Sequence, residues 1–314
     1  MNKSGKLREI PPSSNNTHRQ RTPIDADATY RIGLCGFRIR GSRHLMPSLL
    51  ECVQAAFKGA NGQKLLLLPG QWKRRKPRKR WPSIREIAMV ATTEKLPIIF
   101  EAPERSSRTY TAVSDAGEQL PLKLYQQFWT GKNATPEAVK GLVKECNPKG
   151  KRAIDIAGLT VGLLICGENN VLTNKQSDHN RGVRVRHSRA RDLFRGVRLI
   201  FNGAHTKMGN WGKLEWRFRF LSKHKRWFFY ATNNNDKREK WGKSTLCVYY
   251  NRRRIATSAG LEPRARRKQE VNGKIKWEDV HLRGQKDPIS FALVTSKDDR
   301  CIILTVDIPG KLLQ

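Results

Sequence analysis

Val161-Gly-Leu-Leu-Ile-Cys-Gly-Glu-Asn169 is a short apolar run that ends on a thiol, a glycine and a carboxylate. Its length and composition predict a buried strand. Ligands of open α/β sheets collect beyond the carboxyl ends of the strands, so a cysteine at this position is well placed for chemistry. Cys166 is therefore our candidate nucleophile. The competing interpretation is a small buried hydrophobic residue, which is a frequent role of free cysteine.

The segments around this stretch predict an α/β fold. A strand at Tyr30–Phe37, a helix over about residues 43–59 and a buried strand at Leu65–Pro69 give a β-α-β order, which is typical of parallel sheets. Ser83-Ile-Arg-Glu86 has the spacing of a capping box and predicts the start of a second helix. The other expected elements are strands near residues 96–100, 110–114, 154–165, 197–202, 227–233, 244–250, 254–256, 290–294 and 301–306, and helices near 135–145, 181–196 and 211–222.

The charge of the chain points to polyanionic partners. Its 314 residues include 62 Lys and Arg against 27 Asp and Glu, which gives a formal net charge of +35. Such a chain repels itself unless counterions or polyanions are near, so nucleic acid is an expected partner. Acidic residues are sparse and scattered, which disfavours a metal-dependent nuclease because metal-assisted phosphoryl transfer uses clustered carboxylates. The histidines, His205 among them, are interpreted as ordinary polar or phosphate-facing residues.

The cysteines and the amino-terminal segment bound the cellular setting. Six cysteines are scattered without a CxxC pair or zinc-like histidine spacing, which predicts a reduced, cytoplasmic protein without a metal or cofactor. Residues 1–28 are rich in Ser, Asn, Arg and Pro and predict a disordered basic tail rather than a signal peptide. No apolar run approaches the length of a membrane span. Residues 29–314 are expected to form one domain.

A basic loop follows the strand at Leu65–Pro69. Gln71-Trp-Lys-Arg-Arg-Lys-Pro-Arg-Lys-Arg-Trp81 contains seven cations between two tryptophans. Cations interleaved with aromatic rings suit phosphate contacts and base stacking, although a solvated loop or an address signal explains the pattern equally well. The candidate polyanion-binding residues are Trp72, Lys73, Arg74, Arg75, Lys76, Arg78, Lys79, Arg80 and Trp81.

The order of elements and three local motifs resemble the nitrilase, or carbon-nitrogen hydrolase, superfamily over residues 30–308. That family has a strand ending in Pro-Glu, a strand-turn-strand leading to a lysine, and an apolar strand ending in cysteine. Leu65–Pro69, Tyr110–Lys123 and Gly162–Glu168 look like these three motifs. The resemblance implies a four-layer α-β-β-α sandwich, usually paired into a homodimer.

The resemblance also implies a set of site residues. Cys166 matches the family's nucleophile, Lys123 matches the lysine that stabilises the oxyanion, and Glu168 matches a position where the family often has an acid. A thiol is mostly protonated at neutral pH, and an attacked carbonyl develops negative charge, so the chemistry needs both a base and an oxyanion stabiliser.

One departure from the family pattern concerns the general base. Where the family has Pro-Glu, this chain has Pro69-Gly70-Gln71, and its base is missing from the expected position. Either another acid, such as Glu101 or Glu104 after the neighbouring strand, has taken over, or the fold no longer hydrolyses. Residues 71–81 begin next to the lost glutamate, so we expect them at the mouth of the pocket.

Two functions therefore stay open. In the first, the protein cleaves a small amide or nitrile, either neutral or anionic, through Cys166. In the second, it is a catalytically degenerate nitrilase fold that binds nucleic acid through residues 71–81, 181–198 and 264–268. The retained cysteine and lysine favour hydrolysis, whereas the lost glutamate and the charge favour binding.

Overall fold

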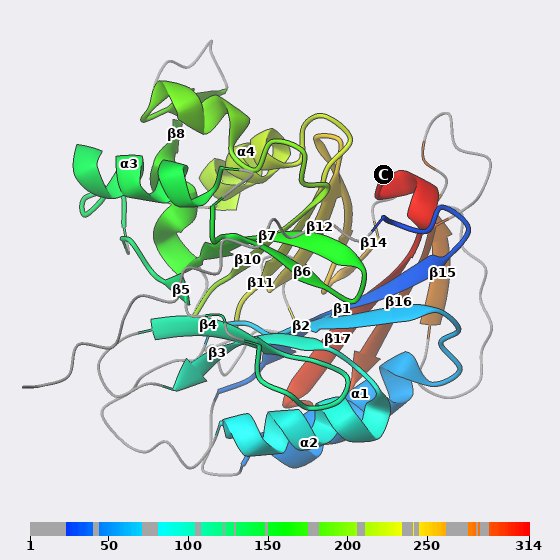
Figure 1. The fold of residues 1–314 in the computed structure, drawn as a ribbon. Coiled ribbons are helices and arrows are strands. Elements are labelled where there is room, and N and C mark those ends of the chain that lie inside the picture. Colours follow the sequence, from blue (N-terminus) through cyan, green and yellow to red (C-terminus); the bar gives the residue numbers. More distant parts are fainter. Residues whose placement is uncertain are drawn as a thin grey trace, which may run out of the picture.

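Two β-sheets stacked face to face form the centre of the protein (Figure 1). The computed structural model describes residues 23–39, 44–70, 81–103, 108–120, 122, 124–128, 130–147, 150–174, 182–205, 211–233, 241, 245–261, 276–280, 282 and 289–314. The first sheet has the order β15 (Lys276–Val280), β16 (Ile289–Thr295), β17 (Cys301–Pro309), β1 (Thr29–Phe37), β2 (Gln63–Leu67), β3 (Ile98–Pro103), β4 (Arg108–Val113) and β5 (Leu124–Tyr125).

The second sheet carries the strand that leads to Cys166. Its order is β14 (Gly260–Leu261), β13 (Arg253–Thr257), β12 (Leu246–Tyr250), β11 (Trp227–Ala231), β10 (Leu199–Gly203), β7 (Leu159–Ile165) and β6 (Ala153–Ile156). Strands β7, β10 and β11 run parallel to one another, so their carboxyl ends meet at one edge of the sheet. Strands β8 (Leu172–Asn174) and β9 (Val183–Val185) form a separate small ribbon.

Helices cover the outer faces of both sheets. Helices α1 (Met46–Phe57) and α2 (Ile84–Glu94) pack on the first sheet, and α3 (Pro136–Glu145) and α4 (Trp211–Leu221) pack on the second (Figure 1). Three short 3₁₀ turns, η2 (Cys166–Val171), η3 (Ser188–Asp192) and η4 (Gly310–Leu312), complete the described elements. The expected four-layer α-β-β-α sandwich is therefore confirmed.

The apolar run at the second strand shows why the sheets are buried on both faces. Leu65 and Leu67 point into the core between the two sheets, whereas Leu66 points into the core beneath α1 and α2. Successive side chains of a strand face opposite sides, so a sheet covered on both sides needs a continuous apolar run. The capping box at α2 is also confirmed, because Ser83 Oγ accepts from the Glu86 backbone N–H and the Glu86 carboxylate accepts from the Ser83 backbone N–H.

Two expectations about local structure are wrong. The described part of residues 181–196 is not helical but forms β9 and η3, because Val183 and Val185 alternate with the exposed Arg184 at the period of a strand. The predicted tail is ordered over residues 23–28: the backbone carbonyls of Ala26 and Ala28 accept hydrogen bonds from Lys311 and Gly310. No helix among the described residues is long and apolar enough to cross a membrane.

Candidate functional site

Cys166 lies at the carboxyl end of β7, as the sequence predicts. Its backbone has φ +46°, in the left-handed region that L-residues with side chains rarely adopt, and such strain is typical of residues held for function. Cys166 is partly exposed, whereas the other five cysteines are all buried. The thiol at the strand end is therefore the one that a reagent or substrate can reach.

His205 and Glu101 approach Cys166 from two different strands. His205 follows β10, the parallel neighbour of β7, and Glu101 lies on β3 of the other sheet. The imidazole Nε2 of His205 lies 2.6 Å from Oε2 of Glu101, and the His205 side chain also hydrogen bonds Cys166. His205 and Glu101 are both buried. A thiol, an imidazole and a carboxylate are thus connected in one series of contacts, which is the set of groups that can activate a nucleophile.

The two partners of His205 control its charge. Burial alone would lower the pKa of the imidazole, but the hydrogen bonds from Cys166 and Glu101 and the charge of Glu101 raise the pKa of His205 to about 9. A carboxylate only accepts hydrogen bonds, so Nε2 carries a proton at the contact with Glu101. At neutral pH the site therefore holds an imidazolium beside the thiol, which is the arrangement that favours a thiolate.

Stability should depend on pH through His205. The folded chain keeps the His205 proton up to about pH 9, whereas an unfolded histidine releases it near pH 6.5. The contribution is complete below about pH 6.5 and is lost as the pH rises to 9. We expect the free energy of unfolding of wild type, relative to His205→Gln, to fall by up to roughly 3 kcal/mol over this range. Denaturant unfolding at a series of pH values measures this difference, and a constant difference would contradict it.

Gly70 provides the space for this histidine. A Cβ atom on residue 70 would lie 2.7 Å from Oε2 of Glu101 and 2.9 Å from Nε2 of His205. Both distances are shorter than side chains tolerate, so a glutamate here is incompatible with the observed pair. The departure from the Pro-Glu pattern and the Glu101–His205 pair are thus two parts of one arrangement.

Gly70→Ala should disturb the site while leaving the fold intact. The added methyl group forces His205 and Glu101 apart, so we expect alkylation of Cys166 at pH 7 to slow about 10-fold as the imidazolium leaves the thiol. Reaction rates with iodoacetamide measure the effect. Gly141→Ala is a control, because a Cβ at that position would lie 3.5 Å from its nearest neighbour, Gln127 Oε1, which is ordinary van der Waals contact. Equal rates in wild type and Gly70→Ala would mean that the close approach does not matter.

Asn233 holds the loops of the site together. Its Nδ2 donates to the backbone carbonyls of Gly70, at 2.6 Å, and His205, at 3.0 Å. The Gly70 backbone N–H in turn donates to the carbonyl of Ala204, at 3.1 Å. The strand ends of the two sheets are therefore linked directly at the site. Asn233 is buried, and its Oδ1 has no hydrogen-bond partner among the described residues.

Arg152 and two backbone N–H groups bind the carboxylate of Glu168. Its carboxylate is buried and forms an ion pair with Arg152, which is itself fully buried. The same carboxylate accepts from the backbone N–H groups of Ile165 and Gln127, both at 2.7 Å. Burial raises the pKa of Glu168, opposed by the charge of Arg152. This network holds the turn that carries Cys166.

The other predicted site residues are only partly described. Lys123 and the basic-loop residues from Trp72 to Arg80 lie outside the described residues. Trp81 is described, and its ring packs edge to face on Phe37, with ring centroids 5.4 Å apart. That contact makes Trp81 part of the packing around Phe37 at the end of β1. Sequence reasoning missed His205 as a base, although its position just after the strand next to β7 was a usable signal.

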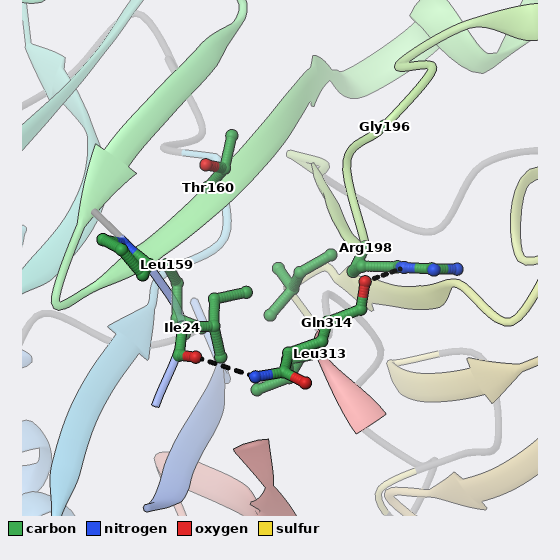
Figure 2. Close-up of a pocket in the computed structure, with 9 residues that line it drawn as sticks. Ile24, Leu159, Thr160, Gly196, Arg198, Leu313 and Gln314 are labelled. Carbon is green, nitrogen blue, oxygen red and sulfur yellow. Dashed lines mark hydrogen bonds between the residues drawn. The ribbon is translucent and has the colours of Figure 1, made fainter. Parts of the chain in front are cut away.

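A surface cavity of about 280 Å³ lies far from this site (Figure 2). It is lined by Ile24, Leu159, Thr160, Arg198 and Gln314 among others, at the amino ends of β7 and β10. Cys166 and His205 follow the carboxyl ends of the same strands, on the order of 20 Å away at about 3.3 Å per residue. The cavity therefore has no part in the Cys166 site.

Comparisons with known proteins give matches of low similarity. No protein-family model matches the chain, and no curated protein matches it. Among solved structures, a glutamine-dependent NAD(+) synthetase from Cytophaga hutchinsonii is 12% identical with a TM-score of 0.48 over 90% of this chain, which spans 43% of that protein. A CN-hydrolase superfamily protein from Xanthomonas campestris, with an arsenic adduct in its active site, is 10% identical with a TM-score of 0.45, over 73% of this chain and 86% of that one.

Proposed function

We propose that the protein is a hydrolase of carbon-nitrogen bonds that uses Cys166 as nucleophile, with His205 and Glu101 replacing the glutamate that the nitrilase pattern places at residue 70. The hydrogen-bonded series from Cys166 through His205 to Glu101 carries the proposal. It is the same logic as other catalytic triads, in which a histidine exchanges the proton and an acid orients the histidine. Convergence on this logic from an unrelated scaffold is well precedented.

The proposed reaction begins with attack of the Cys166 sulfur on the carbonyl carbon of an amide. The tetrahedral intermediate collapses as the carbon-nitrogen bond breaks, and His205 gives its proton to the leaving nitrogen. A thioester remains. Neutral His205 then takes a proton from water, the hydroxide attacks the thioester, and the thiolate leaves with a carboxylic acid as product. A histidine with a pKa of about 9 holds the proton that the first step needs.

Two residues complete the proposed machinery. Lys123, the predicted oxyanion stabiliser, would supply positive charge to the intermediate. Glu168 would act as a positioning residue through Arg152 and the Ile165 backbone rather than at the substrate. Asn233 Oδ1 is buried and has no hydrogen-bond partner among the described residues, which favours an amide over a nitrile as substrate because an amide carries N–H donors that this acceptor can bind.

Ammonia release from a panel of primary amides and nitriles tests the proposal. We expect wild type to release ammonia from at least one amide, and Cys166→Ala to release none. Intact-mass analysis during turnover should show an acyl adduct in wild type, which peptide mapping places on Cys166. Release that persists in Cys166→Ala, or a Cys166 no more reactive than free cysteine in a chain that turns over nothing, would overturn the proposal.

A further inference from the structure

The edge of the second sheet opposite the Cys166 site gathers positive charge. Strands β10 and β11 are parallel, so the residues just before them meet at their amino ends, and the β12–β13 turn joins them because Tyr250 pairs with Trp227. We call this surface the basic edge. It consists of Arg191, Arg198, Lys223, Lys225, Arg226 and Arg252.

The six cations of the basic edge outnumber the one neighbouring carboxylate, Asp192, that acts on Lys223 and Arg226. Within the described residues, no ion pair involves any of its six cations. Arg198 donates to the main-chain oxygen of Gln314, the last residue, as drawn in Figure 2, and to the backbone carbonyl of His224, and Arg226 donates to the carbonyl of Leu193. Carbonyl oxygens hold a guanidinium in place without cancelling its charge.

The cations also lie close enough to act on one another. Burial lowers the pKa of Lys223, and the charges of Arg226, Arg252 and Arg191 lower it further, with Asp192 alone acting in the opposite direction. Burial and the charges of Lys223, Arg226 and Arg252 likewise lower the pKa of His224. The cations of the basic edge therefore repel one another, and an anionic partner would relieve this repulsion.

The backbone presents these side chains on fixed turns. Lys225 and Arg252 have φ +55° and +68°, in the left-handed region. Each turn is tied by a side chain: Asn251 Oδ1 accepts from the Lys225 backbone N–H, and Ser222 Oγ accepts from the Arg252 backbone N–H. The cations therefore project from turns whose backbone is already ordered, which lowers the entropic cost of binding.

We propose that the basic edge is a docking surface for the phosphodiester backbone of a nucleic acid. Arginine forks suit phosphate oxygens, and the net charge of +35 suits an extended polyanion. A lipid surface fits less well, because interfacial binding also needs apolar side chains to insert. The large exposed hydrophobic residues in the described part of the chain are Met89, Tyr125 and Trp216, and none of them belongs to this edge.

The position of the basic edge separates docking from chemistry. Seven residues along β10 lead from Arg198 to His205, which corresponds to on the order of 20 Å. A nucleic acid bound here leaves the Cys166 thiol open. The proposal therefore does not depend on hydrolysis, and the two functions can fail separately.

The test compares two triple variants that lose the same charge. Arg191→Gln, Lys225→Asn and Arg252→Asn remove three exposed cations of the basic edge, and asparagine tolerates the left-handed backbone of two of them. Lys58→Gln, Lys95→Asn and Lys140→Gln remove three exposed cations elsewhere, and Lys95 is also left-handed. Fluorescence anisotropy with a labelled DNA duplex and a labelled RNA strand gives Kd over a salt series.

We expect the basic-edge variant to bind about 10²-fold more weakly at 0.1 M salt and to lower the salt slope by roughly 2–3, because about 0.9 counterions are released per phosphate contact. The control variant should keep the wild-type slope, and saturating DNA should leave Cys166 alkylation unchanged in wild type. Equal weakening in both variants would overturn the proposal, as would protection of Cys166 by DNA, which would indicate binding at the Cys166 site instead. Binding to phosphatidylserine vesicles but to neither nucleic acid would also overturn it.

Discussion

Replacing His205 with Gln is expected to slow alkylation of Cys166 at pH 7 by roughly 30-fold. Without the imidazolium, the thiol should behave as that of an ordinary cysteine, which is half-ionised near pH 8.5. At pH 7 only about 3% of such thiols are thiolates. The lower intrinsic nucleophilicity of the wild-type thiolate offsets part of this difference, so about 10-fold is the smallest effect we expect. Any amide turnover should fall further, by about 10²–10⁴-fold, because the proton donor to the leaving nitrogen is also lost.

The rate of carbamidomethylation against pH, with the adduct located by peptide mapping, measures this effect. His224→Asn changes an exposed histidine at the opposite edge and should leave the profile unchanged. Glu101→Gln keeps a hydrogen-bond partner for Nε2 but removes its charge, so it should fall between wild type and His205→Gln. The thiol is not activated if the wild-type rate follows ordinary thiol ionisation with pH and if His205→Gln and Glu101→Gln both react at that same rate.

Arg152→Met should be the most destabilising single substitution discussed here. It leaves the buried Glu168 carboxylate without its ion-pair partner, and loss of one member of a buried pair costs about 3–5 kcal/mol. In a domain of this size, that corresponds to a fall in Tm of roughly 6–15 °C. Thermal unfolding followed by circular dichroism measures the shift.

A surface ion pair provides the matched comparison. Arg31 contacts both carboxylate oxygens of Asp307, at 2.7 and 2.6 Å, and water still reaches both side chains, which are 12% and 19% exposed. Arg31→Met should therefore cost less than Arg152→Met, because the remaining Asp307 carboxylate can be hydrated. The double variant Arg152→Met with Glu168→Leu should recover part of the lost stability, since no buried charge is left unpaired. If Arg152→Met lowers Tm no more than Arg31→Met does, the Arg152–Glu168 pair is not what holds the turn at Cys166.

The layers of the fold were predictable because their signals are local. The triple leucine at Leu65–Leu67 requires burial on both faces of a strand, and the β-α-β order places it in a parallel sheet. The helix predicted at residues 181–196 was wrong because its many arginines outweighed the short alternation of Val183 and Val185 in the sequence pattern. The boundary of the predicted tail was placed too late because residues 23–28 are held by backbone hydrogen bonds to Gly310 and Lys311, which composition does not reveal.

The site was only half predictable, for a different reason. Cys166 follows a recognisable strand, and Glu101 was one of two acids expected to replace the base. The pairing itself joins three distant segments across two sheets: Gly70 makes room, Glu101 comes from the neighbouring strand, and His205 comes from the facing sheet. The spacing of these three residues along the chain does not indicate that they meet. The expected glutamate is absent at Gly70, and in the structure the His205 imidazole lies beside that residue.

Because Cys166 is the one partly exposed cysteine of the six, its labelling can report whether the site is occupied. Burial raises the pKa of Cys146 and Cys247 well above the ordinary value, so a maleimide dye at neutral pH should couple at Cys166 alone. Any compound that occupies the site would slow this coupling. Competition against labelling could therefore rank candidate ligands in a single chemical screen, before a substrate is known and whether or not turnover occurs.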